Sequence, residues 1–514
     1  MKELPDFPKC SPFLPCYGKF DLTTYIQGAS DYEIMCNLVQ LYNTMSNGYT
    51  KITDVVTKNN EIIENVLTYL KAQEGFNNNI RVYNTFTDAL NDTGLIENMV
   101  VITLGYDEIN DGGAGTYLMH APYNSPYHIK YNETLDFVYT FTNIVNFKAL
   151  GGSNNIDNNS PLLQSLLDFD KSGNNWIFFP TGNYKFADPI TLTKTRIIKL
   201  MGQCSGQLRK VLSNDGIPAT GATSALTYTG NSNSTFITSN CVFAEVKDLF
   251  FLSDSCYFHI VPIATRPFTP YNPYQLITSK ENVNAIDFHT AERATFNNVH
   301  IEGFSGVGVY TRGTWTLTGM HIRACGTGIY QLASDTELFN SYIVGCKIGV
   351  DVIGVFFAYG VFIDQCCENG FFSNREQATL HFVGIIDHMG YAGINFINAL
   401  DINLFARIGR CGMYYAGYTG QITDYNELQK NSFISIQKLD NGNMHLFSYK
   451  RSITDSNNSN EYDLPNLYFN GKIWSNVAIF GLNTQDNYQI KSSAFISITN
   501  STLYSCNGAS TLNT

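Results

Sequence analysis

The stretch between residues 296 and 415 has a regular internal repeat, and this repeat limits the possible folds more than any other feature of the chain. Three isoleucines keep a strict 21-residue spacing, a phenylalanine and three cysteines keep it in a second register, and six glycines keep nearly the same period. The three sets are Ile301, Ile322 and Ile343; Phe304, Cys325, Cys346 and Cys367; and Gly308, Gly328, Gly349, Gly370, Gly393 and Gly412. Several registers held in phase indicate that each unit is one structural repeat.

Within each unit, apolar and polar residues alternate with a period of two, as they do in short strands. Val299 and Ile301 share one face, and the residues that follow each of them share the other. The pattern predicts a mainly β fold, a stacked parallel solenoid in which each unit is one coil. The isoleucine and phenylalanine/cysteine positions would form interior ladders, and each glycine a tight corner. An antiparallel β-sandwich is the alternative, but a sandwich does not keep several registers in phase.

The charge and composition exclude some classes of function. The 514 residues carry a formal net charge of −12, which disfavours nucleic-acid binding because a phosphate binder needs a basic face. No apolar run approaches the roughly 20 residues of a membrane span, so we expect no membrane insertion. The first residues contain no apolar signal core, so we expect synthesis in a cytoplasm. The twelve cysteines include no CxxC pair, and we expect neither a metal nor a cofactor.

Residues 1–74 predict an attachment segment followed by a helical stalk. The start of the chain, up to Ser30, contains four prolines and indicates an irregular segment that docks on something else rather than folding alone. From Ile52 to Leu70, apolar residues recur at alternating spacings of four and three, a heptad seam with one polar member, Asn59. Both a short coiled coil that oligomerises the chain and an amphipathic helix that packs on its own domain fit this pattern.

Three further regions follow the stalk. Residues 75–145 alternate strand-like runs with turns and predict a small β-containing head module. Residues 146–423 contain the solenoid. After Gly420 the 21-residue period is lost, and residues 424–514 alternate short strands with Asn/Gly/Ser turns, which predicts a separate β-rich C-terminal module.

Two motifs resemble the start of a known family. Residues 105–117 read GYDEINDGGAGTY and resemble the GYxxxxDGGGxxY segment found ahead of the solenoid in many bacteriophage tailspikes. An Asn/Asp-rich loop, an apolar run and the sequence FFPTGNY at 178–184 then follow, similar to the start of the pectate-lyase-like superfamily. Loop 152–159 departs from that family's usual GDGxxDD pattern. A helix at 160–170 would cover the strand edges and apolar core exposed at the open end of the solenoid.

The resemblance implies a right-handed parallel β-helix in a virion protein, a tailspike or tail appendage made in the host cytoplasm and acting at the host cell surface. It implies a homotrimer, attachment to other tail or collar proteins through the N-terminal segment, and binding of a host surface glycan such as capsule, exopolysaccharide or teichoic acid. The C-terminal module would serve trimer closure or receptor contact.

The resemblance leaves two classes of function open. In the first, the protein is a polysaccharide depolymerase, a glycoside hydrolase or a lyase. In the second, it is a receptor-binding or structural spike without a catalytic group. A free cellular pectate-lyase-like enzyme is a third interpretation, against which the tailspike-like head segment argues.

Outward residues at equivalent positions of stacked coils form columns, because the coils lie roughly 4.8 Å apart. Two carboxylates, Asp364 and Asp387, would lie about 5 Å apart, near the separation expected of a retaining glycosidase, and their repulsion would raise one pKa. Glu302 and Arg323 would form an ion pair in the same column. The two columns contain His300, His321, Tyr342 and Phe362, and Glu302, Arg323, Val344, Asp364 and Asp387. The residues of the first column could contact substrate. The charged residues of the second column could equally be ordinary solvated charges, which would give the same sequence pattern.

Three weaker candidates lie nearby. Glu368 is a spare acid at the corner of the Asp364 coil, and His388 follows Asp387 directly. Between residues 255 and 284 the period breaks, and this aromatic-rich insert includes Tyr271 and Tyr274. The insert would either form a wall on which a sugar stacks or merely cover an edge of the solenoid.

Overall fold

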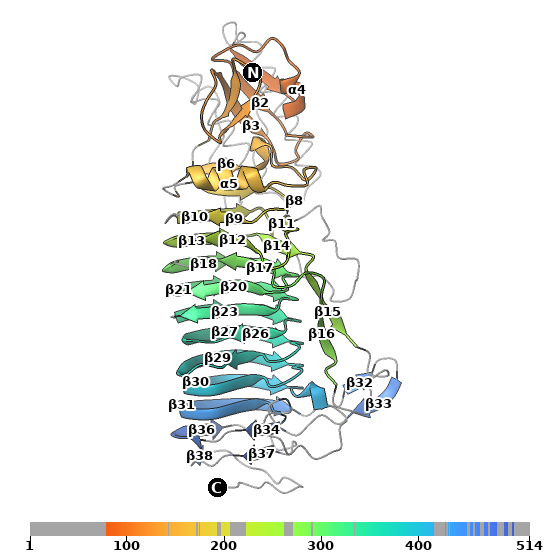
Figure 1. Ribbon diagram of the computed structural model, residues 1–514, viewed down its shortest axis with the longest axis vertical. Coiled ribbons are helices and arrows are strands. Elements are labelled where there is room, and N and C mark those ends of the chain that lie inside the picture. Colours follow the sequence, from red (N-terminus) through yellow and green to blue (C-terminus); the bar gives the residue numbers. More distant parts are fainter. Residues whose placement is uncertain are drawn as a thin grey trace, which may run out of the picture. The chain divides into compact units, whose positions relative to one another are not determined.

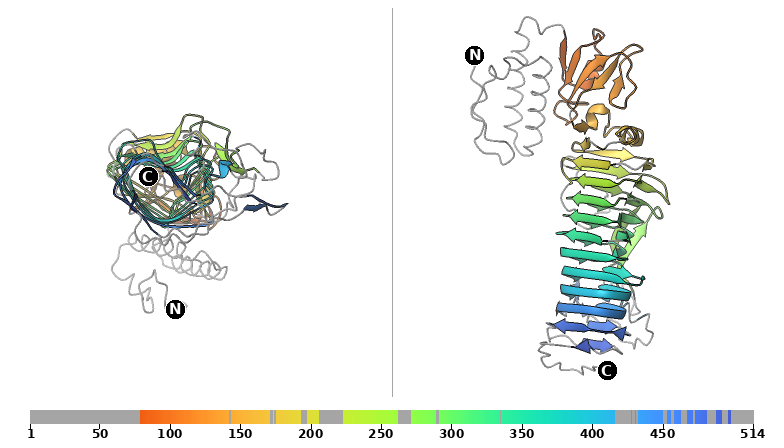
Figure 2. Two further views of the ribbon diagram at one scale, coloured as in Figure 1. Left: turned by 90° about the horizontal axis from the view of Figure 1, so that it is seen from below. Right: turned by 90° about the vertical axis from the view of Figure 1, so that its left-hand side faces the viewer.

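A computed structural model describes most of the chain beyond residue 78 (Figures 1 and 2). The predicted attachment segment and helical stalk, residues 1–74, lie outside the described residues. The chain divides into two compact units, Met1–Phe141 and Thr142–Thr514. The described ranges are 79–141, 143–170, 175–192, 197–205, 223–261, 271–288, 291–333, 335–415 and 432–449, with isolated residues and short strands between them and up to residue 497.

In its described part, residues 79–141, the first unit contains a five-stranded sheet and one short helix. The first two strands pair in parallel, and the other pairs are antiparallel. The helix α4 (Phe86–Leu90) begins with a capping box on Thr85, and Phe86 is buried against the ring of Phe137. In their order across the sheet, the strands are β1 (Ile80–Tyr83), β2 (Val100–Thr103), β3 (Gly115–His120), β5 (Asp136–Tyr139) and β4 (His128–Lys130).

The GYDEINDGGAGTY segment folds around the carboxylate of Asp111, between β2 and β3. This carboxylate accepts four backbone N–H bonds of 2.8–3.2 Å, so it organises the whole loop. Gly105 has no room for a side chain, because its Cβ would lie 1.7 Å from the carbonyl oxygen of Glu108. The N–H donors belong to Tyr106, Asp107, Glu108 and Gly113. In this chain the motif therefore builds a loop.

The second unit is a parallel β-helix, which confirms the predicted fold (Figure 1). Each regular coil contributes three short strands, and each strand pairs in parallel with its equivalents in the coils before and after it. The right-hand view of Figure 2 shows these coils stacked one beyond another. The strands therefore line up as three faces, called here the first, second and third face.

The three faces are made of equivalent strands from successive coils. The first face contains β7 (Trp176–Phe179), β10 (Ile197–Gly202), β13 (Phe243–Lys247), β18 (Arg293–Asn297), β21 (Thr314–Thr318), β24 (Asp335–Phe339) and parts of the long strands β27 (Val355–Asp364), β29 (Ala378–Asp387), β30 (Ile394–Gly409) and β31 (Ile434–Tyr449). The second contains β8 (Gly182–Phe186), β11 (Ser224–Tyr228), β14 (Phe250–Ser253), β19 (His300–Glu302), β22 (His321–Arg323), β25 (Tyr342–Val344) and the ends of β27, β29 and β30. The third contains β9 (Ile190–Leu192), β12 (Thr235–Ser239), β17 (Asn284–Asp287), β20 (Val307–Arg312), β23 (Thr327–Ala333), β26 (Ile348–Asp351), β28 (Phe371–Ser373) and the starts of β30 and β31.

The interior is filled by the predicted ladders. Ile301, Ile322 and Ile343 are buried and lie opposite one another in successive coils. The phenylalanine/cysteine ladder is buried too, and the described cysteines form no disulfide. Such ladders bury apolar surface in every coil, which is the main favourable term in stacking them.

The glycine ladder has a different cause from the predicted one. A Cβ on Gly308, Gly328, Gly349 or Gly370 would lie 2.5–2.7 Å from the carbonyl oxygen of the next glycine along the stack. Of the six glycines only Gly412 has a left-handed φ. The expectation of tight corners is therefore wrong for the other five glycines. At Gly308, Gly328, Gly349 and Gly370, the carbonyl oxygen of the neighbouring coil occupies the space that a side chain would need.

The helix α5 (Ser160–Phe169) lies at the start of the ladder, where a capping helix was predicted (Figure 1). It has Pro161 in its first turn, and it buries Leu163, Leu166 and Leu167. Before it, β6 (Ile144–Asn146) pairs with β7. Among the described residues, no helix is both long and apolar enough to cross a membrane.

Parallel pairing continues past residue 423, where the sequence analysis placed the start of a separate module. Ile394 of β30 pairs with Ile434 of β31, so the intervening coil is nearly twice as long as a regular one and breaks the repeat. The described part of the C-terminal region therefore extends the ladder. Its further strands are β34 (Leu467–Asn470), β35 (Ile473–Trp474), β36 (Val477–Phe480), β37 (Tyr488–Lys491), β38 (Ile496–Ser497) and the antiparallel pair β32 (Ile453–Asp455) and β33 (Asn458–Tyr462).

Candidate functional site

The second face carries the two columns that the sequence analysis singled out. Strand pairing places their members in register on successive coils, and Asp364 lies opposite Asp387 although the coil between them is longer than the regular repeat. The register runs through His300, His321, Tyr342 and Phe362, and beside them through Glu302, Arg323, Val344, Asp364 and Asp387. The structure therefore brings the predicted candidates together on one face.

The charged column is largely buried, which the sequence pattern did not indicate. Asp364 is 9% exposed, Asp387 4% and Arg323 7%. Burying a charge costs free energy unless the charge is paired and hydrogen-bonded, so these residues are not ordinary solvated surface charges. Either a structural or a chemical role must account for them.

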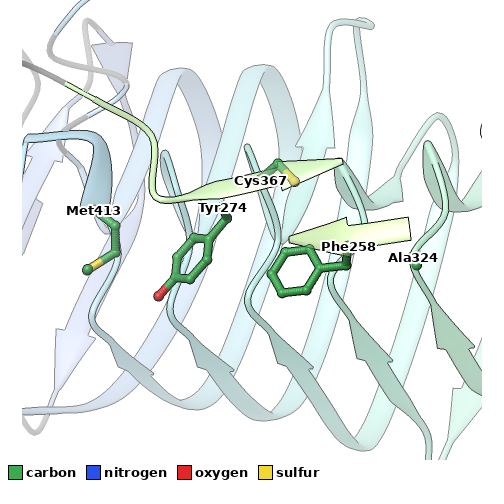
Figure 3. Packing of buried hydrophobic residues seen from close by; sticks show 5 residues of the cluster. All are labelled: Phe258, Tyr274, Ala324, Cys367 and Met413. Carbon is green, nitrogen blue, oxygen red and sulfur yellow. The ribbon is translucent and has the colours of Figure 1, made fainter. Parts of the chain in front are cut away.

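The insert forms a hairpin that lies along the solenoid and covers the corner that follows the second face (Figure 1). Its strands are β15 (Cys256–Ile260) and β16 (Tyr274–Thr278), paired antiparallel. Phe258 and Tyr274 pack against Ala324, Cys367 and Met413, which lie on every second coil (Figure 3). Two roles were predicted for the insert, and this packing agrees with the one in which it covers an edge of the solenoid. Tyr274 is only 5% exposed and cannot offer its ring at the surface.

Residues before β16 also attach the hairpin to the coils. The backbone N–H of Tyr271 donates to the carbonyl oxygen of Tyr414 at 2.9 Å. The side chain of Asn272 donates to the carbonyl oxygen of Cys367. Tyr271 itself is half-buried, and its hydroxyl oxygen accepts a hydrogen bond from Gln275.

Each of the two column carboxylates is paired with a cationic or titratable side chain. Asp387 accepts two hydrogen bonds from the guanidinium of Arg410, one of them 2.8 Å from Nε to Oδ1. His388 Nδ1 lies 2.9 Å from Asp364 Oδ1 and 3.7 Å from Asp387 Oδ1. The hydroxyl of Tyr342 donates to the other oxygen of Asp364 at 3.4 Å. The predicted repulsion between the two carboxylates is therefore offset by Arg410 and, when protonated, by His388.

His388 and Arg410 owe their positions to the corner after the second face. Ala324, Gln365, His388 and Arg410 all have left-handed backbones, with φ of 46–56°, and Gly345 has φ of 64°. Each of these five residues comes directly after a residue of the second face. The five preceding residues lie in register on successive coils and are Arg323, Val344, Asp364, Asp387 and Gly409. Left-handed conformations are costly for residues other than glycine, and they persist only where the surrounding packing fixes them. The sequence analysis did not name Arg410. This residue occupies the position equivalent to His388 in the next coil, and that equivalence was the signal that could have identified it.

The first members of the columns form a separate polar cluster. Glu302 lies 3.8 Å from Arg323 and 3.6 Å from the ring nitrogen of His300, so the predicted Glu302–Arg323 ion pair is present. The ring of His300 stacks on Phe250, with centroids 4.2 Å apart. Glu368 is half-buried and pairs with Lys347 at 3.5 Å, outside the column.

The ring column behaves as a largely uncharged surface beside the carboxylates. Burial and the positive charge of Arg323 lower the pKa of His321 to about 4, so the ring is neutral at pH 7. Burial and the charge of Asp364 raise the pKa of Tyr342. Neutral imidazole and phenol groups can both donate and accept hydrogen bonds, as recognition of sugar hydroxyls requires. Among the described residues, no group of His, Cys, Asp and Glu is arranged to hold a metal.

The free energy of unfolding should fall as the pH is lowered from 6.5 to 4, because of His321. Its pKa is lowered from 6.5 to about 4 in the folded protein, so the unfolded chain binds more protons in this range. His321→Gln should reduce this loss of unfolding free energy by on the order of 1 kcal/mol, after a discount for solvent screening of a partly exposed ring. Urea unfolding at both pH values measures this, with His259→Gln on the exposed side of the hairpin as control. Equal slopes for His321→Gln and the wild type would contradict the assignment.

No family model matches the chain, and no curated protein does so. Several solved structures resemble it. The full-length tailspike protein 2 of the Escherichia coli O157:H7 bacteriophage CAB120 is 14% identical, with 84% of this chain and 57% of that chain covered and a TM-score of 0.48. The tailspike gp49 of the Acinetobacter baumannii bacteriophage Fri1, a capsular polysaccharide depolymerase, is 11% identical, with 81% and 69% covered and a TM-score of 0.34.

A bacterial protein shows a likeness of the same kind. Pantoea stewartii WceF, a glycan biofilm modifying enzyme with a tailspike-like parallel β-helix fold, is 9% identical, with 73% of this chain and 52% of that chain covered and a TM-score of 0.34. This chain spans a little over half the length of the tailspike 2 and WceF chains. At these identities the likeness concerns the fold.

Proposed function

We propose that the protein is a bacteriophage tail appendage of the tailspike kind, which attaches the virion to its host by binding a surface glycan and degrades that glycan. The tailspike-like segment 105–117 and the capping helix α5 precede the β-helix in the order found in that family, which supports the tail-appendage part. The observation that supports degradation is the contact between Asp364 and His388, with His321 and Tyr342 in the neighbouring column.

In this proposal Asp364 and His388 move the proton. Their side chains are 13% and 20% exposed, so a substrate group could reach them from solvent. In hydrolysis a proton passes to the departing glycosidic oxygen while a water oxygen bonds to the anomeric carbon. In elimination a base removes a proton from the sugar carbon next to a carboxyl group as the glycosidic oxygen departs. Both reactions need a positioned acid or base, so the proposal is a polysaccharide-degrading enzyme of either type.

A binding protein without activity is the second candidate, and one observation favours it. Asp387 is held by Arg410 through both oxygens, so it has no free carboxylate oxygen for a nucleophilic role. Asp364 and Asp387 would then serve the structure of the corner, and the faces of the solenoid would act only as adhesive surfaces. We further propose assembly as a homotrimer, with a mass in solution three times the 57.5 kDa of the chain, and contact with other tail proteins through residues 1–74.

Glycan size before and after incubation with the full chain separates these candidates. Capsular glycan, exopolysaccharide and teichoic acid are each purified from the host and analysed by size exclusion, and binding is measured on the same samples. Loss of polymer size supports the enzyme. Binding without loss of size supports the adhesive spike. Neither binding nor cleavage of any host surface glycan would overturn the proposed function.

A further inference from the structure

The third face carries a column of aromatic and acidic residues that the sequence analysis did not single out. The column passes through five successive coils on β17, β20, β23, β26 and β28. At roughly 4.8 Å per coil it extends over about 19 Å. Its members are Asp287, Tyr310, Tyr330, Asp351 and Phe372.

The aromatic members form a partly exposed apolar strip. Tyr310, Tyr330 and Phe372 are all half-buried, so part of each ring reaches solvent. The rings of Tyr310 and Tyr330 lie 5.5 Å apart at an angle of 62°. Tyrosine combines a flat apolar face with a hydroxyl at its edge. A sugar has the matching pattern, with C–H groups on its faces and hydroxyls around its rim.

Asp351 supplies an acceptor that no described residue uses. Its Oδ1 atom is buried and has no hydrogen-bond partner among the described residues. A buried polar atom without a partner costs free energy, so a ligand that donates a hydrogen bond would be favoured at this point. Burial raises the pKa of Asp351 to about 6, and the charge of the exposed Arg375 lowers it. Asp364 and Asp387 differ, because protein groups already contact them.

The charges of the column restrict the ligand. Asp287 and Asp351 flank the two tyrosines, and the whole chain carries a net charge of −12. A polyanion such as teichoic acid would be repelled by this net negative charge. A neutral glycan would not be repelled, and its hydroxyls can donate to Asp351.

We propose that the column from Asp287 to Phe372 is a glycan-binding platform for a neutral, hydroxyl-rich polysaccharide, separate from the Asp364–His388 site on the second face. Sugar rings pack on Tyr310, Tyr330 and Phe372, and a hydroxyl donates to Asp351. The platform rests on the proposed function for the source of the ligand. It narrows that function to neutral glycans and therefore to hydrolysis, because elimination needs a carboxyl group on the sugar.

The test is the affinity of the full-length protein for purified neutral host glycan and for purified teichoic acid. The variant Asp364→Asn serves as the background, so that the proposed cleavage does not consume the polymer. Tyr330→Ala and Tyr310→Ala should each weaken binding of the neutral glycan at least tenfold, and Asp351→Ala should weaken it several-fold. Tyr359→Ala is the matched control, because Tyr359 is an exposed tyrosine on the first face, and it should leave the affinity unchanged. Unchanged melting temperatures exclude misfolding of the variants.

The outcomes distinguish the platform from the proposed function. If the background protein binds no host glycan, the proposed function fails. If it binds glycan but the Tyr310 and Tyr330 variants bind as tightly as the Tyr359 variant, the platform is overturned while the function stands. Tighter binding of teichoic acid than of neutral glycan would overturn the charge argument. Weaker neutral-glycan binding in all three third-face variants, at Tyr310, Tyr330 and Asp351, with the control unchanged, would support the platform.

Discussion

Asp364→Asn should lower the rate of glycan cleavage by about 100- to 10,000-fold, the usual loss on removing a general acid or base. Asparagine keeps the shape of the side chain and can still accept from Tyr342, but it cannot take up or release a proton at neutral pH. The contact with His388, now 2.9 Å, would lose its charge-assisted character. Initial rates of reducing-end or unsaturated-sugar formation measure the effect for hydrolysis and elimination respectively.

Two variants accompany this measurement. Glu368→Gln removes the other candidate acid, which pairs with Lys347 at the coil corner, and should leave the rate within about twofold of wild type. His388→Gln should also lower the rate, because the glutamine amide cannot exchange a proton with Asp364 as an imidazole can. Cleavage by Asp364→Asn at the wild-type rate would remove Asp364 from the proposal, whatever the result for binding.

Strand registers were accessible from the sequence because they are a local property of the repeat. The columns through His300 and Glu302 follow from one period and one alternation, and parallel pairing keeps them in step from coil to coil. The same reasoning placed Asp364 opposite Asp387 across a longer coil. Extra residues of that coil enter between Phe372 and Leu380, at the corner between the third and the first face, and the pairing of Asp364 with Asp387 on the second face stays in register.

The packing of the hairpin β15–β16 on the coils was not accessible in the same way. Phe258 contacts Ala324 and Cys367, which lie far away in the sequence. A periodic pattern within coils contains no information about a segment that interrupts the period. The aromatic content of the insert predicted a contact surface of some kind, and only the three-dimensional packing shows that Tyr274 faces the coils.

The third-face column was missed for a related reason. Tyr310, Tyr330 and Phe372 lie at equivalent positions of successive or alternate coils, so their alignment is present in the sequence. The missing hydrogen bond of Asp351 Oδ1 depends on the packing around it and has no signature in the sequence. Position in a column is predictable from the repeat, whereas the satisfaction of polar atoms is not.

Arg410→Ala should destabilise the solenoid by about 3 kcal/mol, the lower end of the range for removing one partner of a buried ion pair. Asp387 is 4% exposed and would keep its charge without the guanidinium that now donates to both of its oxygens. Because Arg410 is itself partly exposed, water would replace some of the lost hydrogen bonds and keep the loss at that lower end. Arg293→Ala, at an exposed arginine of the first face, is the matched control and should change stability by less than about 0.5 kcal/mol.

A double-mutant cycle decides whether this loss comes from the ion pair. Asp387→Asn combined with Arg410→Ala should be more stable than Arg410→Ala alone, because the neutral amide no longer needs a cation. Urea unfolding midpoints of the wild type, the two single variants and the double variant measure the coupling between the residues. Additive effects would show that Arg410 stabilises the corner through packing rather than charge. A positive coupling would establish that Asp387 is held as a structural ion, which leaves Asp364 as the carboxylate available for chemistry on the second face.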